Sequence, residues 1–347
     1  MNQQSQERQQ QLREEFLSLK TPYALCGLLQ TDMRRLKLQL QQPKYKAFTV
    51  PKKDGGQRQI EAPGPGIKRL QTRLNRYLRA VYYFEKSHAA YGFVLNVRND
   101  ADRRNVLTNA RKHLGRPYLL NIDLKDFFHQ VKQKRVKQLF GSTPFSFERD
   151  IPNLLTRLVT FKGRLPMGAP SSPVVSNLAC LKLDEMLSRW CEQRGWVYTR
   201  YADDLSFSHE QAIGLADLLA LKKIIQNAHF KVNEDKIKLY GPDEDKVVTG
   251  LILREKVELA AGYLTNLSEE IGRLASVFQA QNRQGELHTR WADKLKQQVF
   301  GRINFAGFVM GRRNQQYIDL KNQYYAAVNP PEEEFGAMSW WGFPYNF

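Results

Sequence analysis

The chain has 347 residues, and its 53 lysines and arginines against 35 aspartates and glutamates give a formal net charge of +18. That length supports a large core and more than one subdomain, and the excess of positive charge favours a polyanionic partner, most simply nucleic acid, over a basic protein without such a partner. No stretch approaches the roughly 18 apolar residues of a membrane span, the first residues lack signal-peptide order, and Cys26, Cys180 and Cys191 have no metal-site spacing, so we expect a cytoplasmic protein without a membrane partner.

The first third of the chain reads as helices around one hairpin. Leucines at three- and four-residue spacing predict short amphipathic helices between residues 21 and 42. Residues 48–51 and 57–60 bracket the glycine turn 53–56, which predicts a β-hairpin. A helix is expected over 67–84. The hairpin is basic, and its charges either face water or contact phosphate.

The next segment leads into a buried strand. Residues 95–113 are rich in Asn and Arg, and Asn109 and His113 either pack locally or meet RNA. Tyr118–Asp123 is a short apolar run that ends in an acid, which predicts a buried strand with Asp123 at its exit. An amphipathic stretch follows, so Asp123 is either a helix N-cap or a ligand. Phe127 and Phe128 are adjacent and should face different ways, one of them into the core.

A loop and a long helix follow. Gly168 to Pro173 reads as a loop, in which small residues let backbone approach a ligand closely. The apolar spacing over 174–194 predicts one helix.

Two adjacent aspartates then stand in Tyr201-Ala202-Asp203-Asp204. The flanks alternate apolar and polar residues over 198–208, which predicts a β-hairpin with the acid pair at its tip. Asp-Asp is also a common turn dipeptide, but adjacent carboxylates repel each other and call for a cation, and hard oxygen ligands suit Mg²⁺. If the strand ending at Asp123 pairs with this hairpin, the three acids converge and can bind two ions roughly 3.5–4 Å apart.

The remaining third is a helix, a strand and a helical region. A helix is predicted over 214–230, a strand over 247–253 with Thr249-Gly250 suited to a close backbone approach, and helices from residue 264 onward. Pro330 begins an acidic and aromatic tail that breaks the basic trend.

Several ordered blocks resemble a known family. Asn121–Phe128, Leu165–Pro173 and Tyr201–Asp204 are similar to the palm motifs of reverse transcriptases. Asn109–His113 and Val248–Gly250 resemble patterns of the bacterial retron type. The similarity runs from about residue 21 to about residue 320.

This resemblance implies an α+β right-hand polymerase fold with an antiparallel palm sheet, helical fingers and a helical thumb. The implied domains are an N-terminal helical extension (1–47), fingers (48–118), a palm (119–258) with an inserted fingers segment at about 133–163, a thumb (259–327) and a C-terminal tail (328–347).

The resemblance also implies roles for individual residues. Asp123, Asp203 and Asp204 would assemble two Mg²⁺, with Mn²⁺ as a substitute. Lys236, in the spacing Asn-x-x-Lys, would protonate the leaving pyrophosphate, and a solvated lysine is the alternative. The residues implied in dNTP binding are Arg58, one of Lys52 and Lys53 (we choose Lys53), Phe128 beneath the sugar, Met167 and Gly168. Those implied at primer and template are Tyr201, Thr249 and Gly250. Met167 departs from the family, because a glutamine is usual there and methionine cannot make its hydrogen bond.

The function implied is that of a retron RNA-directed DNA polymerase. Its partners would be dNTPs, a cognate structured non-coding RNA of the msr–msd type, its single-stranded DNA product (expected form, a 2′–5′ branched RNA–DNA) and a separate effector protein in anti-phage defence. The alternatives are a group II intron-like reverse transcriptase and a catalytically idle RNA-binding scaffold that restrains an effector.

Overall fold

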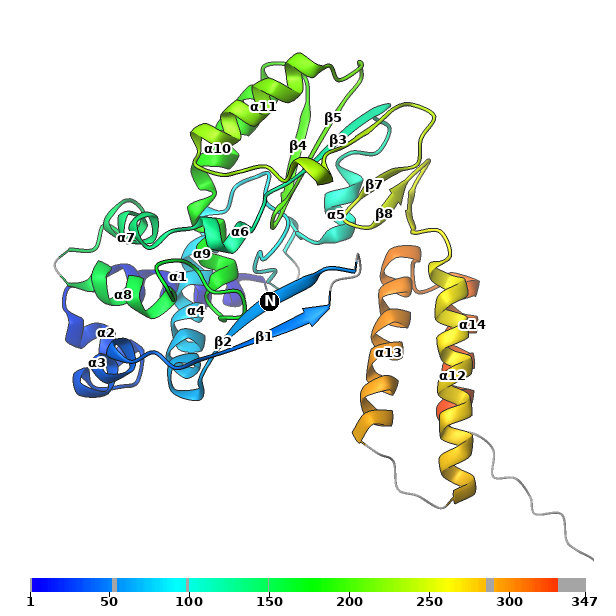
Figure 1. Cartoon of the computed structure of the whole chain (residues 1–347), viewed down its shortest axis with the longest axis horizontal. Coiled ribbons are helices and arrows are strands. Elements are labelled where there is room, and N and C mark those ends of the chain that lie inside the picture. Colours follow the sequence, from blue (N-terminus) through cyan, green and yellow to red (C-terminus); the bar gives the residue numbers. More distant parts are fainter. Residues whose placement is uncertain (1, 52–54, 98–99, 149, 285–289, 330–347) are drawn as a thin grey trace, which may run out of the picture. The chain divides into compact units, whose positions relative to one another are not determined.

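The computed structural model describes residues 2–51, 55–97, 100–148, 150–284 and 290–329. Its contacts divide the chain into two compact units, 1–256 and 257–347 (Figure 1). Helices and antiparallel sheets are both present, so the α+β class is confirmed. Across the described ranges, no helix is long and apolar enough to cross a membrane.

Three helices open the first unit: α1 (Asn2–Leu17), α2 (Pro22–Leu28) and α3 (Met33–Gln41). Thr21 and Asp32 cap α2 and α3, because each side chain accepts a hydrogen bond from a backbone N–H of the first turn. The short helices predicted between residues 21 and 42 are therefore confirmed.

The predicted hairpin consists of β1 (Tyr45–Pro51) and β2 (Gln57–Pro63), which pair antiparallel. Helix α4 (Pro65–Glu85) follows, slightly longer than predicted, with its apolar side buried. It packs against α1, where Phe16 stacks on Tyr77 at 5.7 Å between ring centroids and Arg13 pairs with Glu85 at 2.9 Å. The predicted phosphate contact Lys53, and Lys52, lie outside the described residues.

The central sheet has the strand order β4-β5-β3-β6, and all its neighbours are antiparallel. Its strands are β3 (Tyr118–Asp123), β4 (Val197–Tyr201), β5 (Asp204–His209) and β6 (Lys238–Tyr240). Side chains alternate between the two faces of a strand. Leu120 and Ile122 join the main hydrophobic core, whereas Asn121 and Asp123 lie on the opposite, polar face.

The first unit has further helices: α5 (Val106–Arg111), α6 (Phe127–Gln130), α7 (Gln133–Gly141), α8 (Ile151–Val159) and α11 (Leu215–Asn227). The single helix predicted over 174–194 is wrong, because the structure has α9 (Ser172–Ala179) and α10 (Leu181–Glu192) instead. The Cys180 N–H bonds to the carbonyls of both Ser176 and Asn177, which tightens the chain at this junction.

The strand predicted over 247–253 is also wrong. The structure has two strands, β7 (Lys246–Val248) and β8 (Leu251–Leu253), paired antiparallel. Thr249 and Gly250 form the two-residue turn between them with φ of 49° and 80°. Positive φ at both turn positions gives the twist that suits a tight hairpin, and glycine adopts it without strain.

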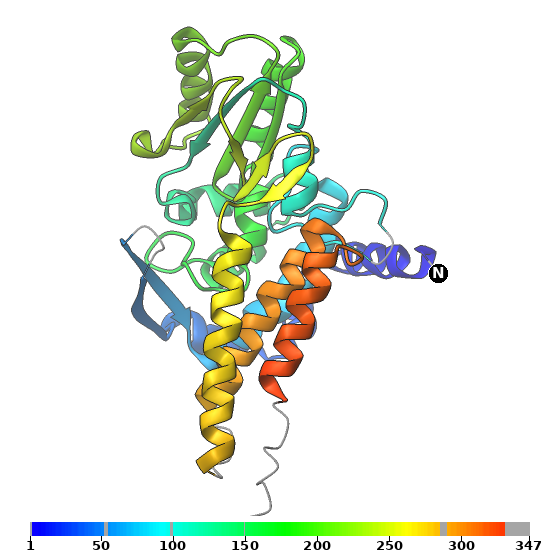
Figure 2. The same ribbon diagram turned by 90° about the vertical axis from the view of Figure 1, so that its right-hand side faces the viewer.

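The second unit contains β9 (Val257–Leu259) and the helices α12 (Tyr263–Gln284), α13 (Arg290–Met310) and α14 (Gln315–Val328). Each of these helices packs against the other two, as Figure 2 shows. They share a hydrophobic core of their own, which includes Leu267, Ile303 and Tyr324. The helical character predicted from residue 264 onward is confirmed, and the predicted tail lies outside the described residues from Pro330.

Candidate active site

Three aspartates meet at one end of the central sheet. Asp123, the last residue of β3, pairs in register with Asp204, the first residue of β5. Asp204 also pairs with Tyr201 of β4, and Ala202-Asp203 forms the turn between the strands. The Leu124 N–H donates to the Asp203 carbonyl at 3.0 Å. The predicted convergence of the three acids is therefore present, and Asp123 is not a helix N-cap.

The aspartates repel one another. Burial, then the charges of Asp203 and Asp123, raise the pKa of Asp204 to about 7. Asp204 lies at the exposed end of its strand, so carboxylate repulsion is the part of this shift that we expect to dominate in solution. Burial and the charge of Asp123 also raise the pKa of Asp203, against the positive charges of Lys236 and Arg58.

Two side chains that follow α11 approach Asp123. Lys236, in the 3₁₀ turn η1 (Glu234–Lys236), places its Nζ 3.2 Å from Asp123 Oδ1. Asn233 donates from Nδ2 to Asp123 Oδ2 at 3.1 Å and from its backbone N–H to the Asp123 carbonyl at 2.8 Å. The structure thus brings Lys236 to the aspartates and adds Asn233, which orients Asp123.

This donor set suits a divalent cation, because closely spaced carboxylates with raised pKa values have an excess of negative charge that a hard cation would neutralise. Within the described ranges no group of three or more His, Cys, Asp or Glu side chains is arranged as a complete metal site. Asp123 faces the Lys236 ammonium instead. Cation binding would therefore require these side chains to adjust.

A buried ion pair supports the aspartate turn from behind. Arg200 of β4 and Asp184 of α10 are both fully buried and bond at 2.7 and 2.8 Å. Arg200 also donates to the Ala202 carbonyl of the turn at 3.1 Å and to Asn177 Oδ1 of α9 at 3.0 Å. No sequence pattern reveals this network, since its members lie 16 and 23 positions apart.

A glycine lets a second segment pack against the same turn. A Cβ added to Gly92 would lie 2.6 Å from the Ala202 nitrogen, closer than atoms can approach. The Gly92 carbonyl accepts a hydrogen bond from Asn177 Nδ2 at 2.9 Å. Tyr201 is half-buried beside Gly92. The predicted primer contact Tyr201 therefore lies at the aspartate turn.

The residues predicted to bind nucleotide come from three elements. Arg58 in β2 is exposed, and its charge acts on Asp203. Phe128 in α6 is half-buried, 6.0 Å from the exposed ring of Phe93 between centroids. Phe127 is buried instead, so the two rings face different ways as predicted.

Met167 and Gly168 lie in the loop before α9, directly against β2. The Glu61 N–H donates to the Met167 carbonyl at 2.6 Å. Gly168 has φ +124°, and a Cβ there would lie 2.9 Å from Ile60 Cγ2, so only glycine fits this conformation and space. Thr249 and Gly250 belong to the β7–β8 turn, which neighbours α5 through a hydrogen bond from Thr249 Oγ1 to the Val106 carbonyl at 3.3 Å.

A sequence profile described as reverse transcriptase (RNA-dependent DNA polymerase) matches residues 50–256, which contain all of these site residues. The chain belongs to this family. It is of the retron type, because the curated relatives that it resembles are retron reverse transcriptases. The match bears out the resemblance that the motifs indicated.

The retron Ec86 reverse transcriptase of Escherichia coli is 34% identical over 220 residues, 62% of this chain and 65% of that protein. The retron Mx162 enzyme of Myxococcus xanthus is 34% identical over 60% of this chain and 47% of that protein. The retron Ec73 enzyme of Escherichia coli is 32% identical over 59% of this chain and 67% of that protein. This chain thus spans about half to two-thirds of their lengths. A telomerase structure from Candida albicans matches 84% of this chain and 61% of its own at a TM-score of 0.42 and 11% identity, and the family assignment does not rest on it.

The two residues that marked the retron resemblance are buried. Asn109 and His113 are each 1% exposed. His113 bonds through its two ring nitrogens to Ser208 Oγ and Thr199 Oγ1, both at 2.7 Å. Both hydroxyls lie on the polar face of the sheet, so His113 fastens the segment after α5 to the sheet. Contact with RNA is therefore not open to these side chains, and local packing is the correct alternative.

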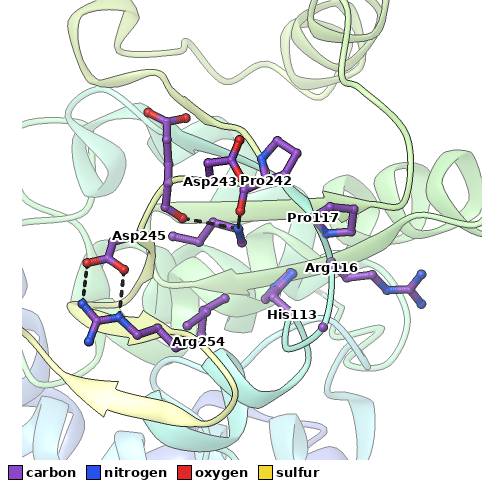
Figure 3. A pocket seen from close by; sticks show the side chains of 11 residues that line it. His113, Arg116, Pro117, Pro242, Asp243, Asp245 and Arg254 are labelled. Atoms are coloured by element: carbon purple, nitrogen blue, oxygen red, sulfur yellow. Dashed lines mark hydrogen bonds and ion pairs between the residues drawn. The ribbon is translucent and has the colours of Figure 1, made fainter.

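A hollow of about 370 Å³ lies near His113, at the other end of β3 from Asp123 (Figure 3). At 3.3 Å per residue, five steps along β3 separate the ends by roughly 17 Å. Three charged side chains of this hollow already have partners: Arg254 bonds to Asp245 at 2.7 and 2.9 Å, and Lys246 donates to three backbone carbonyls. The hollow is separate from the aspartate cluster.

Proposed function

We propose that this chain is a retron RNA-directed DNA polymerase that copies a structured non-coding RNA into single-stranded DNA. The observation that carries the proposal is the convergence of Asp123, Asp203 and Asp204 at one sheet edge, under a finger strand whose Arg58 acts on Asp203. Family membership supports the same reaction. Arginine suits the phosphates of a nucleotide, because its forked donors match two oxygens at once.

In the proposed reaction a primer hydroxyl oxygen bonds to the α-phosphorus of a dNTP while the bond to the β-phosphate oxygen breaks, and pyrophosphate leaves. Two Mg²⁺ ions, or Mn²⁺ in their place, would lower the pKa of the attacking hydroxyl and neutralise the pyrophosphate. Asp123 and Asp203 would hold them directly, with Asp204 as an outer ligand or a guide for the primer. Asn233 keeps Asp123 oriented.

Two further residues act on the leaving group and the sugar. Lys236 is exposed beside Asp123, where its ammonium has a proton to give to departing pyrophosphate. Phe128 presents a half-buried ring, which would clash with a ribose 2′-hydroxyl and so select deoxynucleotides. Met167 would pack against the sugar without the hydrogen bond of the usual glutamine.

The partners in the proposal follow from the relatives. Proteins named retron reverse transcriptases are similar to this chain over 60% and 62% of its length. By that similarity the template and first primer are one non-coding RNA, the product is a 2′–5′ branched RNA–DNA, and a separate effector acts with it in anti-phage defence in the cytoplasm. The basic net charge of +18 suits an RNA partner.

The test is to express the full chain with its native upstream DNA, purify it and separate the bound nucleic acid on a denaturing gel. We expect a discrete DNA that shortens after RNase treatment and is absent from the Asp203→Ala/Asp204→Ala double variant. A matched Asp243→Ala variant, at the distant hollow, should keep the product. RNA alone in every preparation would contradict the proposal and favour the idle RNA-binding scaffold.

A further inference from the structure

One carboxylate of the finger hairpin is buried. Glu61 is 2% exposed, although the first three residues of β2 are exposed. Its Oε1 lies 3.1 Å from Arg164 Nη2 and its Oε2 lies 3.6 Å from His129 Nε2. A buried charge is costly unless it is paired. The position of Glu61 therefore depends on these two partners.

Arg164 supplies the positive charge of this cluster. Burial, and then the nearby Arg164, lower the pKa of His129 below its ordinary value of 6.5, against the opposing charges of Glu61 and Asp126. The imidazole is consequently neutral at pH 7. Glu61 Oε2 and His129 Nε2 are both buried without a hydrogen bond, so the two groups depend on each other's position.

Each member of the cluster belongs to a different element of the proposed nucleotide pocket. Glu61 lies in β2, three residues after Arg58. His129 lies in α6, next to Phe128. Arg164 begins the loop that carries Met167 and Gly168, three and four residues later.

Backbone contacts also join β2 to the loop that carries Met167 and Gly168. The Glu61 N–H donates to the Met167 carbonyl at 2.6 Å, and a Cβ on Gly168 would lie 3.1 Å from the Glu61 carbonyl oxygen. Strand and loop are thus in direct backbone contact at the residue whose side chain reaches both Arg164 and His129.

We propose that Glu61 is a positioning residue that sets the relative placement of Arg58, Phe128 and the Met167–Gly168 loop. This inference rests on the proposed polymerase function. Without the carboxylate, Arg164 loses its buried partner and His129 its neighbour, so the three elements are no longer held in one arrangement.

The expected consequence is weaker nucleotide binding and weaker selection against ribonucleotides, with the chemical step preserved. The chemical step should survive because the carboxylate of Asp123 is held by Asn233 and Lys236, which come from a different part of the chain. The Glu61 cluster instead joins the elements that would surround the base, sugar and phosphates of the incoming nucleotide.

The test uses the full-length chain on an RNA template with an annealed DNA primer. KM for dNTP, kcat and the preference for dNTP over rNTP are measured for wild type, Glu61→Gln and Glu185→Gln. The control residue Glu185 is exposed and pairs with Lys182 and Arg189 on the surface of α10. For Glu61→Gln we expect KM to rise about tenfold, the equivalent of about 1.4 kcal/mol, a fall in sugar preference, and kcat within about threefold of wild type. Glu185→Gln should match wild type.

His129→Gln provides a second variant, because His129 is less buried than Glu61 and its removal leaves the Glu61–Arg164 pair in place. We expect its main effect on sugar preference, since His129 adjoins Phe128. Unchanged KM and sugar preference in both variants, with an active wild type, would overturn this inference alone. A wild-type chain that extends no primer would overturn the proposed function and this inference with it.

Discussion

At the scale of single residues, His113 links folding stability to pH. Burial, and then the charge of Arg116, lower its pKa in the folded chain to about 3 from the ordinary 6.5. Between these values the unfolded chain binds a proton that the folded chain does not. The contribution of His113 to stability is therefore complete above pH 6.5 and is lost as the pH falls below it, by about 1.4 kcal/mol per pH unit.

We expect this loss to appear in urea unfolding at pH 7.5 and 5.5. His113→Gln has an amide that can bond to the hydroxyls of Ser208 and Thr199 without titrating in this range. Between pH 7.5 and 5.5 the free energy of unfolding of the wild-type chain should fall by about 1.4 kcal/mol more than that of the variant. The difference isolates His113 from the carboxylates, whose titration is common to both chains. Equal losses in the two chains would contradict the buried neutral imidazole.

Which site residues could be predicted depends on how local their signals are. Asp123, Asp203 and Asp204 follow from short strand patterns whose register brings them together. Glu61 carries no such signal, because its partners Arg164 and His129 are distant in the sequence and only the packing of β2 against α6 and the loop before α9 joins them. The burial of His113 likewise has no local signal, since a histidine between Lys112 and Leu114 gives no sign of which side faces the sheet.

At the scale of elements, the Arg200–Asp184 pair joins β4 to α10 beneath the aspartate turn. Both side chains are fully buried, and Tyr198 donates a further hydrogen bond to Asp184 at 2.9 Å. Breaking a buried pair from one side leaves an uncompensated charge, which costs roughly 3–5 kcal/mol. We therefore expect Arg200→Met to lower the free energy of unfolding by about that amount.

Chemical unfolding followed by circular dichroism checks this value. The double variant Asp184→Leu/Arg200→Met should be more stable than Arg200→Met, because no unpaired charge stays buried. Glu185→Gln, which breaks exposed pairs on the same helix, should leave stability close to the wild-type value. A loss of stability for Arg200→Met as small as that for Glu185→Gln would show that the buried pair does not hold β4 to α10.

Predicted element boundaries are wrong where a helix breaks or a strand turns without the usual sequence signal. The break between α9 and α10 falls at Cys180, and neither proline nor glycine marks it. The turn between β7 and β8 places Thr249, a β-branched residue, at φ 49°, a conformation that such residues rarely adopt. The apolar residues on either side therefore read as one strand. In contrast, α4 and the β1–β2 hairpin were predicted correctly, because a long apolar period and a glycine turn are strong local signals.

At the scale of the whole molecule, the net charge of +18 predicts that RNA binding depends steeply on salt. Each phosphate neutralised by the protein releases counterions, so the logarithm of the affinity falls in proportion to the logarithm of the salt concentration. Basic side chains in the second unit belong to the proposed thumb. Lys294, Arg312 and Arg313 are exposed there, whereas Arg302 pairs with Glu270 and stacks over Tyr263.

We expect Lys294, Arg312 and Arg313 to bind phosphates of a template–primer duplex. The triple variant Lys294→Ala/Arg312→Ala/Arg313→Ala should reduce the slope of log affinity against log salt by about two to three, close to one for each phosphate that is no longer neutralised. Binding of a labelled duplex at a series of salt concentrations gives this slope. The matched control is the triple variant Lys182→Ala/Arg189→Ala/Lys223→Ala, which removes three exposed cations of the first unit. Equal slopes for wild type and the thumb variant would place the nucleic acid elsewhere. A smaller slope for the thumb variant alone would assign these helices to the duplex, because counterion release depends on the number of neutralised phosphates and not on the shape of the protein around them.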